Sequence, residues 1–203
     1  MSRYPIPAAT LRVEREIKKS RFIGHLGHAA TAEAAQHFIT RIAADYPDAR
    51  HVCYAYIAGQ PGNTTAVGCS DAGEPSGTAG KPMLNVLMHG GVGEIVAVVV
   101  RYFGGIKLGT GGLVRAYGGV VSEAMKLLET RDQIALEQLA LTLPYALEPN
   151  ARRLIEAAEG RIEAVDYGAE LILHCSLPES AIEPLSNQLN NQSGGQLVVK
   201  RII

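Results

Sequence analysis

The chain has 203 residues, 47% of them hydrophobic and 19% charged, with a formal net charge of −1. This composition is typical of a globular protein with ample core, and we expect neither a signal peptide nor a membrane span. The cysteines Cys53, Cys69 and Cys175 are too few and too scattered for a disulfide framework, so we expect reduced thiols and a cytoplasmic location.

The charge is divided unevenly along the chain. Residues 1–130 carry 13 Lys+Arg against 10 Asp+Glu, a balance of +3, whereas residues 131–203 carry 6 against 10, a balance of −4. Glycine density also falls near this point. We therefore predict two domains, 1–130 and 131–203, and expect any polyanion to meet the first.

In the first domain, alternating and β-branched runs predict five strands, over residues 11–17, 22–28, 52–58, 64–69 and 95–100. Helical spacing predicts three helices, over residues 31–46, 81–89 and 111–128. Thr31 is suited to cap the first helix, and the wholly apolar run Ile95–Val100 is expected at the centre of the sheet. Residues 70–82 show no periodicity and predict a long loop with a functional role.

The second domain has a simpler pattern. It predicts strands over residues 139–143, 161–167, 171–177 and 197–203 and two helices, one over 150–158 and one over 182–189. Asn150 is suited to cap the first of these helices, and Gly160 to end it. The resulting order, βαββαβ, is that of a ferredoxin-like domain.

Thirteen of the 22 glycines lie between Gly73 and Gly119. Such density predicts sharp turns or a close approach of the backbone to another group. A P-loop is excluded, because Pro75 stands where that pattern needs a glycine and Pro82 where it needs Ser or Thr. Nucleotide triphosphatase chemistry is therefore not expected.

The segment after the predicted central strand is a better candidate. The strand ends in Arg101, a glycine-rich turn follows, and a helix begins near Gly111, where free backbone N–H groups and the helix dipole favour an anion. The expected anion-binding residues of this segment are Arg101, Lys107, Gly109, Gly111, Gly112 and Arg115. In the alternative reading the glycines only form a tight turn and Arg101 pairs with Glu94 or Asp71, and spacing alone does not separate the two.

Other candidates are more isolated. The residues of the predicted functional loop are Asp71, Gly73, Glu74, Gly77, Thr78 and Gly80. Its two carboxylates lie beside cations, so acid–base work is conceivable, although pairing with Lys81, Arg101 or Arg115 is favoured. The turn Lys18, Lys19 and Arg21 adds positive charge. His51 is suited to contact RNA or to carry a proton, although a lone histidine at a strand edge is more often a surface or hydrogen-bonded residue. No cluster of metal-ligand type occurs, and we expect no metal, no cofactor and no catalytic residue.

Two stretches carry a family resemblance. The segments Asp71–Pro82 (DAGEPSGTAGKP) and Val100–Arg115 (VRYFGGIKLGTGGLVR) resemble the two hallmark stretches of the IMPACT family, and the whole chain resembles its bacterial YigZ-like branch. The resemblance implies an α+β protein with two domains. The first would be similar to domain 2 of the ribosomal protein S5 and to domain IV of elongation factor G, and the second to the ferredoxin-like domain V of that factor.

Those elongation-factor domains meet ribosomal RNA, so the resemblance implies a non-enzymatic RNA- or ribosome-binding protein that modulates translation, with nutrient stress as one setting and translation factors as further partners. Phosphate contacts are expected from the anion-binding residues above together with Lys18, Lys19, Arg21, His51 and Lys81, with Tyr102, Phe103 and Tyr117 stacking on bases. One alternative is an enzyme acting on a phosphorylated small molecule. Another is a protein-interaction module that uses the acidic second domain.

Overall fold

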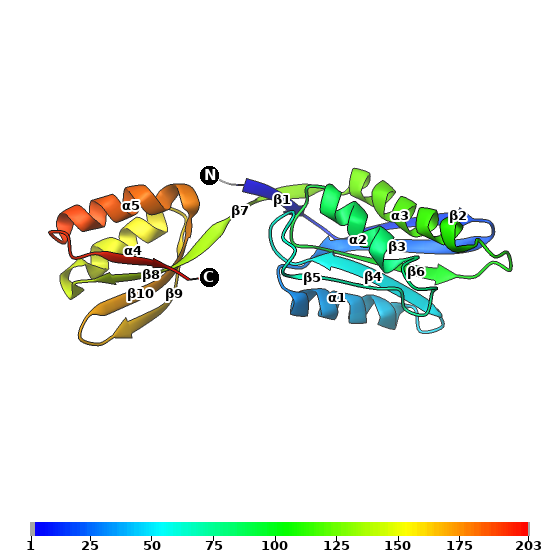
Figure 1. Cartoon of the computed structure of the whole chain (residues 1–203), viewed down its shortest axis with the longest axis horizontal. Helices are drawn as coiled ribbons and strands as arrows, with labels where there is room; N and C mark the ends of the chain where they lie inside the picture. Colours follow the sequence, from blue (N-terminus) through cyan, green and yellow to red (C-terminus); the bar gives the residue numbers. More distant parts are fainter. Residues whose placement is uncertain (1–2, 203) are drawn as a thin grey trace. The chain divides into compact units, whose positions relative to one another are not determined.

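The structure of the protein is a computed structural model that describes residues 3–202. It forms two compact units of mixed α and β structure (Figure 1). The first spans Tyr4–Gln133, and the second comprises Arg3 and residues 134–202 of the described chain. Within residues 3–202, no helix is long and apolar enough to cross a membrane.

The first unit is built on a five-stranded sheet whose neighbouring strands are all antiparallel. In spatial order its strands are β2 (Leu11–Ile17), β3 (Ser20–His28), β6 (Ile95–Tyr102), β4 (His51–Ile57) and β5 (Val67–Ser70). Both faces of β6 are buried, as its apolar run predicts.

Helices cover both faces of this sheet (Figure 1). Helix α1 (Ala32–Asp45) packs on the face to which β6 contributes Val96, Val98 and Val100. Helices α2 (Gly80–His89) and α3 (Thr110–Leu127) pack on the opposite face. The predicted cap of α1 is confirmed, because Thr31 Oγ1 accepts a hydrogen bond from the Ala34 N–H at 3.1 Å.

The sequence did not predict two short strands. β1 (Arg3–Pro7) and β7 (Thr130–Ile134) pair with each other as a separate two-stranded sheet. β1 carries two prolines and β7 is mostly exposed, so neither shows the apolar alternation that marks a half-buried strand. The domain boundary placed between residues 130 and 131 falls within β7.

The second unit has the predicted element order βαββαβ, which the structure confirms. Its elements are β8 (Leu136–Leu143), the short 3₁₀ helix η1 (Tyr145–Leu147), α4 (Glu148–Ala157), β9 (Arg161–Tyr167), β10 (Leu171–Pro178), α5 (Glu179–Gln192) and β11 (Val198–Arg201). The sheet order is β11-β8-β10-β9, and α4 and α5 share one hydrophobic core with it.

The predicted cap at Asn150 is wrong. Helix α4 begins at Glu148, directly after η1, and Pro149 lies in its first turn, where a missing N–H is tolerated. Asn150 therefore lies inside the helix, and its side chain is hydrogen-bonded to Gln192 and Arg153.

Candidate functional site

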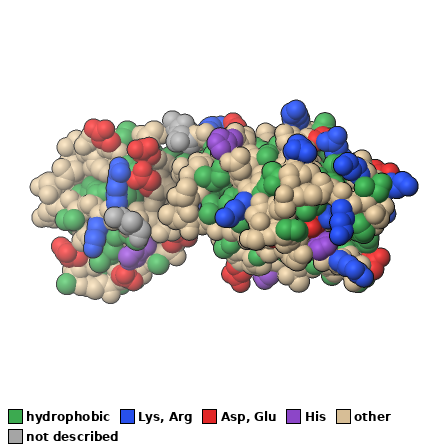
Figure 2. Space-filling model, turned by 45° about the vertical axis from the view of Figure 1, so that its right-hand side comes forward, with side chains coloured by type: hydrophobic (Ala, Val, Ile, Leu, Met, Phe, Trp, Pro, Cys, Tyr) green, Lys and Arg blue, Asp and Glu red, His purple; other side chains and the backbone are tan. Residues whose placement is uncertain are grey.

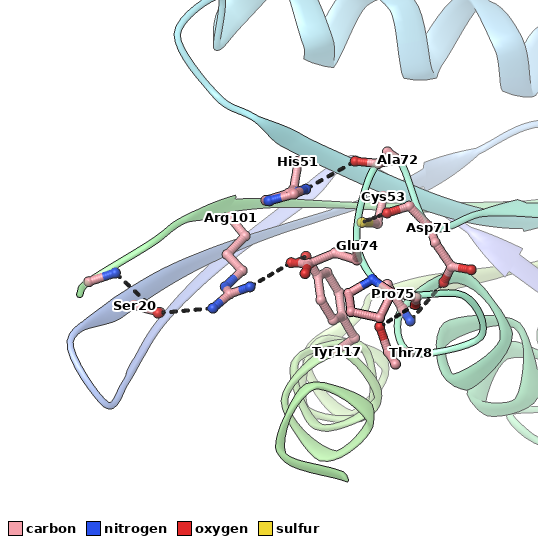
Figure 3. A network of polar contacts seen from close by, with 12 residues as sticks. Ser20, His51, Cys53, Asp71, Ala72, Glu74, Pro75, Thr78, Arg101 and Tyr117 are labelled. Carbon is pink, nitrogen blue, oxygen red and sulfur yellow. Dashed lines mark hydrogen bonds and ion pairs between the residues drawn. The ribbon is translucent and has the colours of Figure 1, made fainter. Parts of the chain in front are cut away.

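The end of β6 carries a buried ion pair (Figure 3). Arg101 is 6% exposed, and its Nη1 donates to Glu74 Oε1 at 2.7 Å. The Tyr117 hydroxyl donates to the same oxygen at 2.8 Å. The pairing of Arg101 with Asp71 or Glu94 is therefore wrong: its partner is Glu74. The charge of Arg101 is neutralised inside the protein rather than offered at its surface.

The other side of Arg101 meets the turn between β2 and β3. Its Nη2 donates to Ser20 Oγ at 3.4 Å, and the Gly104 N–H donates to the same hydroxyl at 3.2 Å. A Cβ at Gly104 would lie 1.8 Å from the Lys19 carbonyl oxygen, so this position requires glycine. The Arg101 guanidinium carbon also lies over the Phe103 ring, 5.6 Å from its centre, which is within the range of a cation–π contact.

Tyr117 and Cys53 extend this network as neutral groups. Burial, with the nearby Cys53 and Glu74, raises the pKa of Tyr117 far above its usual range. Burial likewise raises the pKa of the Cys53 thiol to about 12, and its Sγ donates to the Asp71 carbonyl. Tyr117 is fully buried, so its predicted role in stacking on bases is wrong.

Asp71 organises the functional loop. Its carboxylate accepts hydrogen bonds from the backbone N–H groups of Gly77, Ala79 and Gly80, at 2.7 to 2.9 Å. Partial burial acts to raise the pKa of Asp71, but these three donors and Lys81 outweigh it, so the pKa lies below its ordinary value. The side chain thus anchors the start of α2, which has no side-chain cap of its own.

The remaining loop residues have local roles. Gly73 and Gly77 have φ values of +84° and +75°, which favour glycine, and Thr78 Oγ1 donates to the Pro75 carbonyl. The two carboxylates of the loop are both engaged, Asp71 with backbone and Glu74 with Arg101. This arrangement favours pairing over the acid–base role considered for them.

A cavity of about 690 Å³ opens beside the buried ion pair. It lies where the start of β4, the end of β6 and the start of α3 meet. Its lining residues are Asp48, Arg50, His51, Glu74, Pro75, Arg101, Tyr102, Phe103, Lys107, Leu108, Gly109, Thr110 and Leu113. Of the predicted stacking residues, Phe103 is 55% exposed, whereas the Tyr102 hydroxyl donates to Asp48.

Helix α3 points its N-terminus at this cavity. Gly109 precedes the helix with φ +73°, and no side chain caps it. The first N–H groups of a helix lack partners within the helix and attract anions. Gly111 and Gly112 contribute no side chains to the first turn, and a Cβ at Gly111 would lie 3.6 Å from an Arg115 guanidinium nitrogen. The predicted order of strand, glycine-rich turn and helix is confirmed, and anion binding at this helix start stays a prediction.

A second hollow, of about 250 Å³, adjoins the first through Leu108, which lines both. Lys18 and Arg115 also line it. Lys18 and Lys19 form the two-residue turn between β2 and β3, with φ values of +48° and +63°. A turn of this kind normally takes Asn-Gly, so two lysines there are unusual and cost backbone strain.

Some of the predicted basic residues have an acidic partner and others have none. Arg21 pairs with Glu14 and lies over the Tyr102 ring, and Lys81 lies near Asp71. Within residues 3–202, no ion pair is formed by five further cations that line the two hollows or lie beside their lining: Lys18, Lys19, Arg50, Lys107 and Arg115. Sequence reasoning missed Arg50, which directly precedes His51 at the start of β4. No group of three His, Cys, Asp or Glu in the described part of the chain could hold a metal.

Comparison with known proteins identifies the family. The Impact N-terminal domain matches residues 18–125, which include the whole cavity, and a domain of unknown function, DUF1949, matches residues 141–196. The chain belongs to the IMPACT family. It is 47% identical over 197 residues to the IMPACT family member YigZ of Escherichia coli, with 97% of each chain covered.

Other relatives support the same assignment to the IMPACT family. An IMPACT family member of Haemophilus influenzae is 43% identical, with 98% of this chain and 97% of that protein covered. The IMPACT family member YvyE of Bacillus subtilis is 34% identical, with 91% and 84% covered. A crystal structure described only as that of a hypothetical protein has a TM-score of 0.84 at 46% identity, and the match covers 100% of this chain and 98% of that one.

Proposed function

We propose that this IMPACT family protein binds single-stranded RNA on the ribosome through the first unit and thereby modulates translation, without catalysing a reaction. The observation that carries this proposal is a group of unpaired cations at two hollows that share Leu108. Arg50 and Lys107 line one hollow, Lys18 and Arg115 line the other, and Lys19 follows Lys18 in the turn. Figure 2 shows Lys and Arg side chains gathered on the right-hand part of the molecule, which belongs to this unit. A cytoplasmic location and translation factors as further partners are part of the proposal.

A strand of RNA suits this surface for three reasons. Its phosphates are attracted by Lys107 and Arg115 and by the uncapped start of α3. Its unpaired bases have a platform in the exposed ring of Phe103. An extended strand is also long enough to reach both hollows, which share Leu108 in their lining, whereas a small compact ligand occupies one of them. Arg101 acts in this scheme as a positioning residue that holds the Phe103 ring, since its own charge is paired.

The fold is consistent with this function but supports it only by analogy. The element order βαββαβ with the sheet order β11-β8-β10-β9 favours a ferredoxin-like second unit. We propose that the first unit is of the type of domain 2 of ribosomal protein S5. The pair would then correspond to domains IV and V of elongation factor G, in line with contact to ribosomal RNA.

The proposal is tested by sedimentation with ribosomes and by binding to a fluorescent RNA hexamer across a salt series. If the five unpaired cations each neutralise one phosphate, the slope of log K against log[salt] is about −3.5, which is about a 100-fold loss between 50 and 200 mM salt. The variant Lys107→Ala/Arg115→Ala should lower the slope by about 1.4.

Lys126→Ala is the matched control, because Lys126 is an exposed lysine of α3 that lines neither hollow. It should bind as the unchanged protein does. Absence of binding at low salt, or equal binding by the double variant and the control, would overturn the proposal.

The alternative function, an enzyme acting on a phosphorylated small molecule, is favoured only by the size of the cavity, which lies in the range of small-ligand sites. Asp71 and Glu74 are poor candidates for its acid and base, because both carboxylates are engaged. Turnover of a phosphorylated metabolite that is lost in Lys107→Ala would support the alternative.

A further inference from the structure

His51 presents a hydrogen-bond acceptor of fixed orientation. It is the first residue of β4, and its Nδ1 lies 3.1 Å from the Ala72 carbonyl oxygen. A carbonyl oxygen only accepts, so Nδ1 carries the hydrogen in this bond. In the neutral ring the lone pair then lies on Nε2, which points away from Ala72 (Figure 3).

The partner of His51 is held by an unusual backbone. Ala72 has a φ of +42°, a value that residues with a side chain rarely adopt, and Gly73 follows with +84°. Any Cβ at Gly73 would lie 3.5 Å from His51 Nδ1, so the loop passes directly against the ring. Backbone strain of this kind collects at functional sites, where a group must be held in one orientation.

The ring of His51 lines the cavity together with groups of complementary chemistry. Lys107 and Arg50 are unpaired cations of the lining, and Phe103 offers an exposed ring. The two carboxylates of the lining are engaged, Asp48 with the Tyr102 hydroxyl and Glu74 with Arg101. Each carboxylate keeps a second oxygen, but its negative charge repels a ligand that carries phosphate. Among the ionisable side chains of the lining, His51 is therefore the one that can offer an acceptor without a negative charge.

A ligand that satisfies all these groups has a phosphate, a flat base and a hydroxyl that donates a hydrogen bond. A ribonucleotide has the three together, and its 2′-hydroxyl is the group that distinguishes RNA from DNA. We propose that the cavity holds one ribonucleotide unit whose 2′-hydroxyl donates to His51 Nε2, so that the protein selects RNA over DNA. This inference rests on the proposed RNA-binding function and adds the residue that reads the sugar.

The test compares three hexamers of one sequence, as RNA, DNA and 2′-O-methyl RNA, with the unchanged protein and with His51→Asn. The asparagine amide retains a donor for the Ala72 carbonyl but lacks the acceptor at the position of Nε2. Binding is measured at pH 8, where imidazoles carry little positive charge, and thermal unfolding checks that the variant folds.

The unchanged protein should bind RNA roughly three- to tenfold more tightly than DNA or 2′-O-methyl RNA, the value of one net hydrogen bond. His51→Asn should lower the affinity for RNA to that for DNA and leave the affinity for DNA unchanged. A loss of both affinities alike would show a structural role for His51 and overturn the inference.

Failure of the inference is distinguishable from failure of the proposed function. Equal, salt-sensitive binding of RNA and DNA by the unchanged protein would overturn sugar recognition and leave strand binding standing. Binding of none of the three hexamers, and of neither AMP nor dAMP, would overturn both. Binding of AMP and dAMP is measured in the same way. If the protein binds no hexamer but prefers AMP over dAMP, and loses this preference in His51→Asn, the cavity recognises a free ribonucleotide rather than an RNA strand.

Discussion

The buried pair of Glu74 and Arg101 gives the sharpest stability prediction. The Glu74 side chain is 3% exposed and that of Arg101 is 6% exposed. Glu74→Gln keeps the size of the side chain and an acceptor for the Tyr117 hydroxyl, but leaves the guanidinium charge buried without a counter-charge. Removing one partner of such a pair costs about 3–5 kcal/mol in the free energy of unfolding. For a unit of this size that is a fall in Tm of about 10–20 °C.

The matched control is the exposed pair Arg15–Glu123, whose side chains are 45% and 44% exposed at a distance of 3.1 Å. Glu123→Gln should cost less than about 1 kcal/mol. The free energies of unfolding of both variants are measured by urea denaturation of the full chain, with circular dichroism and tyrosine fluorescence as the signals. The double variant Glu74→Leu/Arg101→Met removes both buried charges and should be more stable than Glu74→Gln. Equally small losses of unfolding free energy in Glu74→Gln and Glu123→Gln would refute the reasoning.

Three further predictions concern backbone, pH and thiols. Gly104→Ala should lower Tm severely, because its Cβ would overlap the backbone of the β2–β3 turn; a melting curve like that of the unchanged protein would contradict this. Asp71→Asn should cost about 1 kcal/mol at neutral pH. Folding lowers the pKa of Asp71, so its stabilisation is complete above the unfolded pKa of about 3.9 and is lost as the pH falls through the folded pKa. The urea midpoints of Asp71→Asn and of the unchanged protein should therefore converge in acid. A thiol reagent at pH 8 should modify exposed Cys69 rapidly and spare buried Cys53 and Cys175, whose pKa values are raised to about 12 and about 11; rapid loss of all three thiols would contradict this.

Much of the fold could be predicted because its signals are local. The apolar run Ile95–Val100 has no polar face, so only a central strand suits it, and Thr31 offers a cap wherever a helix follows. The cap at Asn150 failed for a physical reason: Pro149 fits the first turn of a helix so well that α4 begins before it. The pairing of β1 with β7 joins segments more than a hundred residues apart and leaves no local signal.

The site was predicted less completely than the fold. Sequence spacing brought Lys107, Gly109 and His51 into consideration, and the structure places all three at one cavity. Spacing could not choose the partner of Arg101 among several acidic residues. Glu94, one of those considered, instead holds the Tyr4 hydroxyl at 2.7 Å. Which carboxylate meets a buried cation is decided by packing in three dimensions, not by distance along the chain.

The buried network also sets an order of events during synthesis. Ser20 meets Gly104 across 84 residues, and Glu74 meets Tyr117 across 43. Contacts between such distant segments form slowly, since a long loop must close before they contribute any stability. A nascent chain that has not yet reached α3 lacks Tyr117, the hydroxyl donor to Glu74, and also lacks the wall that Thr110 and Leu113 give the cavity. The cavity therefore forms only after most of the first unit has been translated, and unfinished chains lack it.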